Sequence, residues 1–244
     1  MSVVTTTSTS TTISTSPPSS ARRIQIAGTP AVVVLSGTGD GDVGLRGLER
    51  ADVVRQRRQL VAPGPWRFLR QCHGYDVVVL EPTEACEGRE ADVLVSSLPG
   101  APLAVFSADC AMIALASPEG TVAAVHAGWR GLLAGVIERA AAKMAEMGST
   151  DIAAVIGACI GPECYEFNPA DLEPLVARYG SSLVSVTSKG LPALDLRAGV
   201  HRALEAAGVR LEAELAHCTA CDPGWFSWRA RKDTGRQALV VSLS

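Results

Sequence analysis

The sequence predicts an α+β fold with mixed β-sheets. Short apolar runs typical of strands outnumber the segments with helical periodicity, and the two kinds of segment do not alternate strictly along the chain. A length of 244 residues with 47% hydrophobic residues is ample for one large domain with its own core. The sequence shows no internal repeat, so we expect a single domain.

The first 23 residues differ from the rest of the chain. Fourteen of the first twenty are Ser or Thr, and Pro17-Pro18 follow the run. Such a segment buries too little apolar surface to offset its ordering entropy, which predicts a disordered tail over 1–23 and a catalytic domain over 24–244. A transit peptide is the lesser alternative, because no acidic residue precedes Arg22 but no amphipathic helix with spaced arginines is present either.

Strands and helices follow from apolar patterning and from glycine punctuation. The pattern predicts strands over 31–35, 77–80, 93–96, 103–106, 112–116, 122–126, 152–156, 211–216 and 238–243. It predicts helices over 51–60, 131–147, 169–179 and 195–207, the last three each followed by a glycine.

Composition excludes several classes of protein. The net charge of −3 and the absence of a long Lys/Arg run argue against a nucleic-acid partner, and the basic spot at 55–58 is typical of a solvated helix face. Apolar stretches are interrupted by charge or glycine before they reach membrane-spanning length, which argues against a membrane partner. Seven cysteines, an odd number, without a secretory signal favour the reducing cytoplasm.

His73, Cys110 and His126 are metal-competent side chains where apolar runs end. Imidazole and thiolate are ligands that zinc prefers, and three protein ligands leave a position for water or substrate, as in catalytic sites. The spacing His-x36-Cys-x15-His is not a local metal motif. Spacing alone therefore leaves open an alternative without a metal, in which the two histidines simply lie at strand ends and the cysteine is buried as a small hydrophobic residue.

Two glycines flank Trp129-Arg130 immediately after His126. Gly128 and Gly131 permit a sharp turn and a close approach of the backbone to a ligand. The guanidinium of Arg130 can reach an anionic group such as phosphate. This segment is therefore a candidate part of an active site.

At these residues the sequence resembles the laccase-domain polyphenol oxidases, also described as the YfiH-like or purine nucleoside phosphorylase family, which includes peptidoglycan-editing factors. The resemblance implies two packed sheets with helices outside, a layered α/β/β/α arrangement, and zinc binding by His73, Cys110 and His126. The matching blocks lie in family order over roughly 30–244: 71–74, 108–110, 126–131, 157–166, 194–196, 218–219, 226–229 and 234–237.

Two departures from the family pattern bear on substrate preference. The family usually opens with a Ser/Thr-Arg-x-Gly-Gly segment, whereas 35–41 here reads Leu-Ser-Gly-Thr-Gly-Asp-Gly and lacks the arginine. Met112 stands where proline is usual, two residues after the ligand cysteine. We expect the first departure to affect anion binding and the second only packing.

Further candidate residues lie near these blocks. Asp109 is a candidate catalytic residue that transfers a proton or orients a histidine, or it caps backbone amides. Arg229 and Arg236 are candidate substrate-binding residues for phosphate or hydroxyl groups, or surface ion-pair partners. Tyr165 and the adjacent Glu166 line the pocket or form a structural turn.

Other residues with reactive side chains are expected to lie outside the site. We expect His201 and His217 to be structural or exposed. We expect no redox role for Cys218-Thr219-Ala220-Cys221, because this segment does not open a helix in a thioredoxin-like unit.

The leading functional hypothesis, implied by the resemblance, is zinc-dependent phosphorolysis of adenosine, inosine and methylthioadenosine, with adenosine deamination as a companion activity. Cys110, His126, Asp109 and Arg130 are its candidate catalytic residues, and a monomer or homodimer acts on nucleoside and phosphate. Three alternatives stay open: copper-dependent phenol oxidation, hydrolysis of a peptidoglycan precursor with Cys110 as nucleophile, and a binding module without activity. Copper oxidation usually needs more histidines than the four in this chain.

Overall fold

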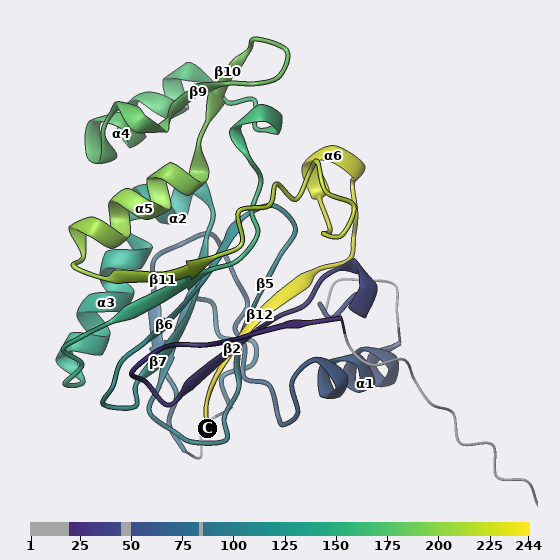
Figure 1. Ribbon diagram of the computed structural model, residues 1–244, viewed down its shortest axis with the longest axis vertical. Coiled ribbons are helices and arrows are strands. Elements are labelled where there is room, and N and C mark those ends of the chain that lie inside the picture. The colour runs from purple at the N-terminus through teal and green to yellow at the C-terminus, as the bar shows by residue number, and fades with distance from the viewer. Residues whose placement is uncertain (1–19, 45–49, 83–84) are drawn as a thin grey trace, which may run out of the picture.

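Two packed β-sheets form the centre of the protein (Figure 1). The computed structural model describes residues 20–44, 50–82 and 85–244. A four-stranded antiparallel sheet has the order β1-β2-β12-β5, a six-stranded mixed sheet has the order β11-β8-β6-β7-β4-β3, and β9 and β10 form a separate hairpin. The strands are β1 (Arg22–Gln25), β2 (Ala31–Leu35), β3 (Val77–Val79), β4 (Val93–Ser96), β5 (Leu103–Ser107), β6 (Ala111–Ala116), β7 (Val122–Ala127), β8 (Ala153–Ile156), β9 (Val184–Val186), β10 (Pro192–Leu194), β11 (Arg210–Glu214) and β12 (Gln237–Leu243).

Helices cover the outer faces of both sheets. Helices α2, α3 and α5 pack on the six-stranded sheet and α4 packs on α2 and α5, whereas α1 lies on the far side of the four-stranded sheet (Figure 1). The α-helices are α1 (Ala51–Val61), α2 (Trp129–Ala134), α3 (Val136–Glu146), α4 (Pro169–Tyr179), α5 (Leu196–Ala206) and α6 (Trp228–Arg231), and the 3-10 helices are η1 (Thr38–Asp40), η2 (Pro162–Cys164) and η3 (Ser181–Leu183). The predicted α+β class and the α/β/β/α layering are confirmed.

The alternation of side chains along each strand explains the layers. On β2, Leu35 faces the core between the two sheets, whereas its neighbour Val34 packs in the cluster under α1. On β6, Met112 belongs to the inter-sheet core and Ile113 to the core under the helices. The four central strands of the six-stranded sheet, β4, β6, β7 and β8, are thus buried on both faces, and for this reason they read as nearly continuous apolar runs.

The prediction of a single helix over 131–147 is wrong. Two helices, α2 and α3, replace it and meet at Gly135, which has a left-handed φ of 85°. A Cβ at this position would also lie 2.5 Å from Nη2 of Arg178. The apolar stripe continues across the break, so periodicity alone could not reveal it.

Some short elements were not predicted. Strand β1 contains Arg22 and Arg23, which composition assigns to the tail, and β9, β10 and α6 were also missed. The predicted disorder of the tail concerns mainly residues 1–19, which lie outside the described residues. None of the helices in the described part of the chain combines the length and the apolar character that a membrane span requires.

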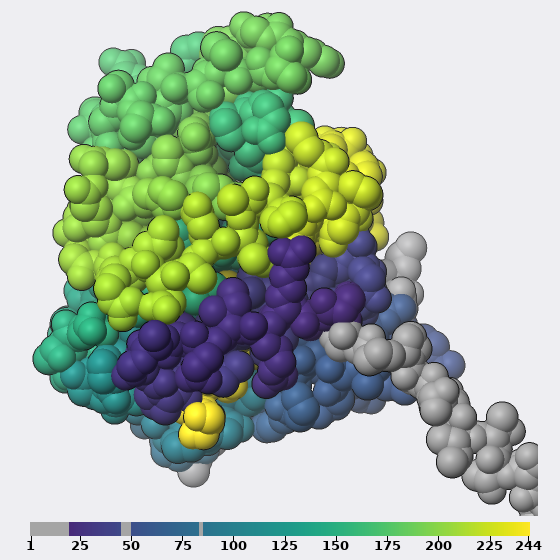
Figure 2. All heavy atoms as spheres, viewed as in Figure 1, coloured from purple at the N-terminus to yellow at the C-terminus, as the bar shows by residue number. Residues whose placement is uncertain are grey.

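The N-terminal strands and the loop after β11 lie side by side. In Figure 2 the purple N-terminal strands adjoin the yellow-green residues that follow β11. The Thr38 hydroxyl donates to the Pro223 carbonyl at 2.9 Å, and the Thr38 N–H donates to the Gly224 carbonyl. The C-terminal segment is thereby held across the sheets, where it becomes one wall of the site described next.

Candidate active site

A cavity of about 750 Å³ lies where the β5–β6 turn, the end of β7, the loop before β3 and the C-terminal segment converge. It is large enough for a small organic molecule. His73, Cys110, His126, Asp109, Arg130, Arg229 and Arg236 all line it, so the structure brings together every predicted site residue. Its walls also include aromatic side chains: Phe68, Phe106, Trp129, Tyr165 and Trp228.

His73, Cys110 and His126 form what we call the cavity cluster. One ligand atom from each lies within 4.8 Å of the others, and Cys110 Sγ is 3.9 Å from His73 Nε2. Tetrahedral zinc with bonds of about 2.0–2.3 Å would need its ligand atoms roughly 3.3–3.8 Å apart. The three side chains therefore need only small shifts to hold one metal ion, and their donor set suits zinc or copper.

Asp92, which sequence analysis missed, orients the cavity cluster. Its carboxylate accepts a hydrogen bond from His126 Nδ1 at 2.7 Å, which leaves Nε2 as the atom available to a metal. It also accepts from the backbone N–H groups of Cys72, His73 and Gly74, and so fixes the loop that carries His73. His73 has a left-handed φ of 63°, a strained conformation that these bonds maintain.

The sequence carries one signal for this residue. Asp92 lies within the apolar run Ala91–Val95 and is 1% exposed, and a buried carboxylate normally requires partners. Its position before strand β4, however, does not reveal which histidine it meets. Orientation of a histidine was one of three roles left open for Asp109. In the structure Asp92 makes the bond to His126, whereas Asp109 accepts from the backbone N–H of Arg229, as in the capping alternative.

Charge within the cluster shifts its protonation equilibria. Burial raises the pKa of the Asp92 carboxyl, but the hydrogen bond and charge of His126 outweigh it and lower this pKa to about 2. Burial also raises the pKa of the Cys110 thiol, but hydrogen bonds with His126 and His73 lower it to about 6. Cys110 is thus available as a thiolate near neutral pH, the form that binds metal or attacks a carbonyl.

Glycine at position 128 makes room for the cluster. A Cβ built there would lie 2.8 Å from His73 Cδ2 and 3.2 Å from Cys110 Sγ. At Gly131 a Cβ would lie 2.8 Å from the carbonyl oxygen of Gly74. Both glycines are therefore required by close approach to other residues of the protein and not by an unusual φ, while their close approach to a ligand stays a prediction.

Asp109 organises the C-terminal wall. Its carboxylate accepts hydrogen bonds from the hydroxyls of Thr219 and Ser227 and from the backbone N–H of Arg229, each at 2.7 Å. Its own φ of 111° is unusual for a residue other than glycine. These three bonds give Asp109 a structural role beside the cavity, and a catalytic role for it stays a prediction.

The arginines supply positive charge to the cavity. Arg130 is exposed and stacks on the Trp129 ring at 4.2 Å, and Arg229 lies 5.0 Å from the centroid of Tyr165. The guanidinium of Arg236 donates to three backbone carbonyls of 233–235 and so also shapes the wall. Arg70, not singled out from the sequence, lines the cavity as well and forms an ion pair with Glu90.

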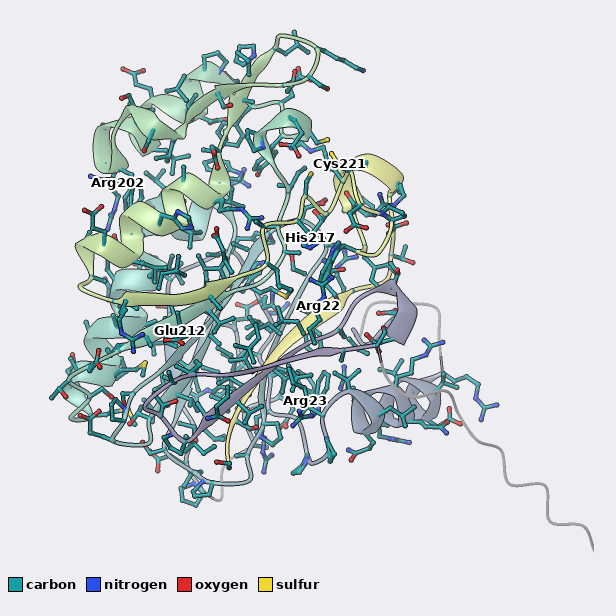
Figure 3. The ribbon with its side chains drawn as sticks, in the orientation of Figure 1. Arg22, Arg23, Arg202, Glu212, His217 and Cys221 are labelled. Carbon is teal, nitrogen blue, oxygen red and sulfur yellow. The ribbon has the colours of Figure 1, made fainter. Side chains whose placement is uncertain are left out.

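The two remaining histidines lie outside the cavity, as expected. His201 in α5 hydrogen-bonds Glu214 at 2.7 Å, and His217 contacts Asp222 and Arg22. Figure 3 shows His217 beside Arg22, where the C-terminal segment crosses β1.

The fold and this cavity define an α+β protein with a candidate metal site open to a small molecule. The chain belongs to the family described as multi-copper polyphenol oxidoreductase laccase, whose family model matches residues 41–244. The resemblance inferred from the sequence blocks is thereby confirmed.

Curated relatives are named for a different chemistry. A purine nucleoside phosphorylase of Streptomyces coelicolor is 38% identical over 187 residues, covering 75% of this chain and 77% of that protein. Purine nucleoside phosphorylase YfiH of Escherichia coli is 34% identical over 198 residues, covering 78% and 81%. These names support an enzyme that acts on a small molecule.

Solved structures agree with the architecture. YlmD from Geobacillus stearothermophilus has a TM-score of 0.78 and 26% identity, and the match covers 93% of this chain and 94% of that one. A Neisseria meningitidis protein has a TM-score of 0.79 at 23% identity, covering 92% and 99%, and this match supports the fold.

Proposed function

We propose that the protein is a zinc-dependent purine nucleoside phosphorylase that also deaminates adenosine. One observation carries the proposal: the cavity cluster opens into a cavity that is lined by both arginines and aromatic rings. Phosphate requires cationic donors, a purine requires flat apolar surfaces, and both occur here beside the candidate metal ligands. The names of the curated relatives support the phosphorolysis part of this proposal.

His73, Cys110 and His126 are the residues that would hold the zinc. When bound, zinc supplies Lewis acidity that activates water or polarises an oxygen. Asp92 keeps His126 in the tautomer with a free Nε2, and Gly128 permits the close packing of His73 and Cys110.

For phosphorolysis, the chain itself supplies positioning. Arg130 and Arg229 project from the cavity wall and can hold phosphate near the anomeric carbon of the nucleoside. Trp129 fixes Arg130 by stacking, and Tyr165 does the same for Arg229. The donors are thus arranged before substrate arrives, which lowers the reorganisation cost of the transition state.

The test uses purified protein of known metal content. With inosine and phosphate we expect hypoxanthine and ribose 1-phosphate in equal amounts, and with adenosine we expect ammonia as well. Omission of phosphate is the control, since phosphorolysis then stops while deamination continues. Protein with stoichiometric zinc that releases no purine base would overturn the proposal, and metal without turnover on any substrate would indicate a binding module.

Two competing reactions have distinct signatures. Copper-dependent phenol oxidation, the chemistry in the family description, predicts stoichiometric copper in protein purified without added copper, and loss of oxidation on its removal. Cys110, with a lowered pKa beside His126, also fits a nucleophile for amide hydrolysis. Hydrolysis of a UDP-muramyl-serine precursor that survives exhaustive chelation would support that alternative.

A further inference from the structure

A second group of metal-competent side chains lies outside the cavity. It joins η2 to the loop between β11 and α6, and one ligand atom from each member lies within 4.8 Å of the others. The described residues that line the cavity include none of its members. We call this group the loop cluster, and it consists of Glu163, Cys164, Cys218 and Cys221.

The fold brings these two loops together independently of the cysteines. The Thr219 N–H donates to the Cys159 carbonyl at 3.2 Å, in an isolated parallel bridge that aligns the segments after β8 and β11. Arg197 of α5 donates to the carbonyls of Leu215 and His217, which fixes the start of the second loop. Figure 3 labels Cys221 in that loop, beside the segment that carries η2.

The chemistry of the loop cluster matches a closed zinc site. Three thiols and one carboxylate give four donors, and Cys218 and Cys221 have the Cys-x2-Cys spacing typical of structural zinc. Tetrahedral zinc holds its sulfur ligands about 3.8 Å apart, and Cys164 Sγ lies 3.2 Å from Cys221 Sγ. That separation is well beyond a disulfide bond of about 2.05 Å.

Two features of Gly161 favour cation binding by the loop cluster. The Gly161 N–H donates to Cys218 Sγ at 3.2 Å, a bond that stabilises a thiolate. A Cβ at Gly161 would collide with the Glu163 carboxylate, so glycine allows this side chain to fold back toward the sulfurs. Cys221 Sγ lies 3.4 Å from Glu163 Oε1.

We propose that the loop cluster binds a second metal ion, a structural zinc with all four ligands supplied by the protein. The ion joins two segments 57 residues apart, and both segments continue directly into the cavity wall. Tyr165 follows Cys164 and lines the cavity, and Thr219 follows Cys218 and donates to Asp109. The second zinc therefore stabilises the wall without contacting the substrate.

The test measures metal content in the full-length protein, expressed with zinc and without added copper. Mass spectrometry should find two zinc ions per chain in the wild type, one for each cluster. Cys110→Ala should retain one, Cys221→Ser should retain one, and the double variant none. Cys86→Ala, which changes a buried cysteine outside both clusters, is the matched control and should retain both.

Cobalt substitution identifies the ligands even where a serine variant folds poorly. Cobalt added to metal-free Cys110→Ala protein should show strong thiolate-to-metal charge-transfer absorption, because three thiolates remain in the loop cluster. Glu163→Gln should keep this absorption and shift the ligand-field bands. Wild-type protein with a single zinc that Cys110→Ala loses and Cys221→Ser keeps would overturn the proposal. Unreduced, denatured and metal-free protein in which only five of the seven cysteines react as thiols would also overturn it, because a Cys164–Cys221 disulfide had formed.

Discussion

The cavity cluster and the loop cluster use similar donors in opposite ways. The cavity cluster has three candidate ligands, one on a loop, one in the β5–β6 turn and one near the end of β7 that is 3% exposed, and it opens into a cavity of about 750 Å³. The loop cluster has four candidate ligands on two loops, with Cys221 exposed at the surface. The number of protein donors, and whether they face a cavity, distinguishes a site that can accept substrate from one that can only stabilise.

The support around each cluster differs as well. Asp92 accepts four hydrogen bonds from nitrogen atoms in and around the cavity cluster, so its geometry is fixed before a metal arrives. In the loop cluster the Gly161 N–H donates to Cys218 Sγ, and the carboxylate of Glu163 is itself a candidate ligand and not an outer partner that orients the others. We therefore expect substitutions near the cavity cluster to change activity, and substitutions in the loop cluster to change stability first.

The largest effect should follow Cys110→Ala. It removes the thiolate, the only charged ligand of the cavity cluster, and two imidazoles alone should not retain zinc tightly. We expect loss of phosphorolysis and of that metal, with the fold intact and a cost of about 1 kcal/mol in unfolding free energy. Turnover assays, metal analysis and chemical denaturation measure these three quantities, and normal turnover with full zinc would remove Cys110 from the ligand set.

Asp92→Asn should weaken metal binding, but less than Cys110→Ala does. The amide cannot serve all the N–H donors that now bind the carboxylate, so both His126 and the loop of His73 lose their orientation. Loss of such an outer partner typically lowers metal affinity about 10–100-fold. Competition with a chromophoric chelator measures this change, and an unchanged affinity would show that Asp92 does not orient the site.

The same variant gives a pH signature. The pKa of Asp92 lies at about 2, below its ordinary value of 3.8, so its stabilising contribution is complete above pH 3.8 and is lost as pH falls toward 2. The difference in unfolding free energy between wild type and Asp92→Asn should therefore be largest between about pH 4 and 6.5. It should shrink below pH 4 as Asp92 takes up a proton, and above pH 6.5 as His126, whose pKa is raised to about 9 in part by Asp92, loses its proton. Denaturation of the metal-free proteins across this range measures it, and a constant difference would contradict the assignment.

Gly128→Ala should have an intermediate effect. The added Cβ would lie within 3.2 Å of both His73 Cδ2 and Cys110 Sγ, so at least one ligand must move. We expect kcat/KM to fall about tenfold or more, because misplacement by about 1 Å can cost a hundredfold. Gly120→Ala is the contrasting control: its left-handed φ of 82° makes it a stability variant, and no atom lies within 4 Å of the added Cβ. Equal activity of Gly128→Ala and wild type would show that the ligands tolerate the Cβ.

Sequence patterns predicted the parts of this protein that depend on local chemistry. Strands β2 and β4 and helix α4 lie at the predicted residues, because buried β-branched runs and the Asn168 cap with Pro169 are local signals. The hairpin of β9 and β10 gave no such signal, since Val184 and Val186 are 55% and 63% exposed and each strand has three residues.

Contacts between residues far apart in the chain could not be predicted from the sequence. Asp92 meets His126 across 34 residues, and no local pattern relates them. The loop cluster was missed for the same reason, because the Cys-x2-Cys spacing gives two donors while Glu163 and Cys164 come from a different loop. Only the pairing of segments after β8 and β11 brings the four together.

The smallest effect should follow Arg130→Lys, and it tests whether the cavity arginines bind phosphate. Lysine keeps the positive charge but loses the planar, bidentate donor and the stacking on Trp129. We expect the KM for phosphate to rise several-fold, about 1 kcal/mol, while zinc content and the KM for inosine stay near wild type. Initial rates with phosphate and inosine varied separately measure the two constants. Arg139→Lys, which changes an arginine stacked on Tyr75 outside the cavity, is the matched control and should change neither constant. An unchanged KM for phosphate in Arg130→Lys and in Arg130→Ala would show that phosphate does not bind at this side chain, and would leave Arg229 and Arg236 as the candidate phosphate ligands.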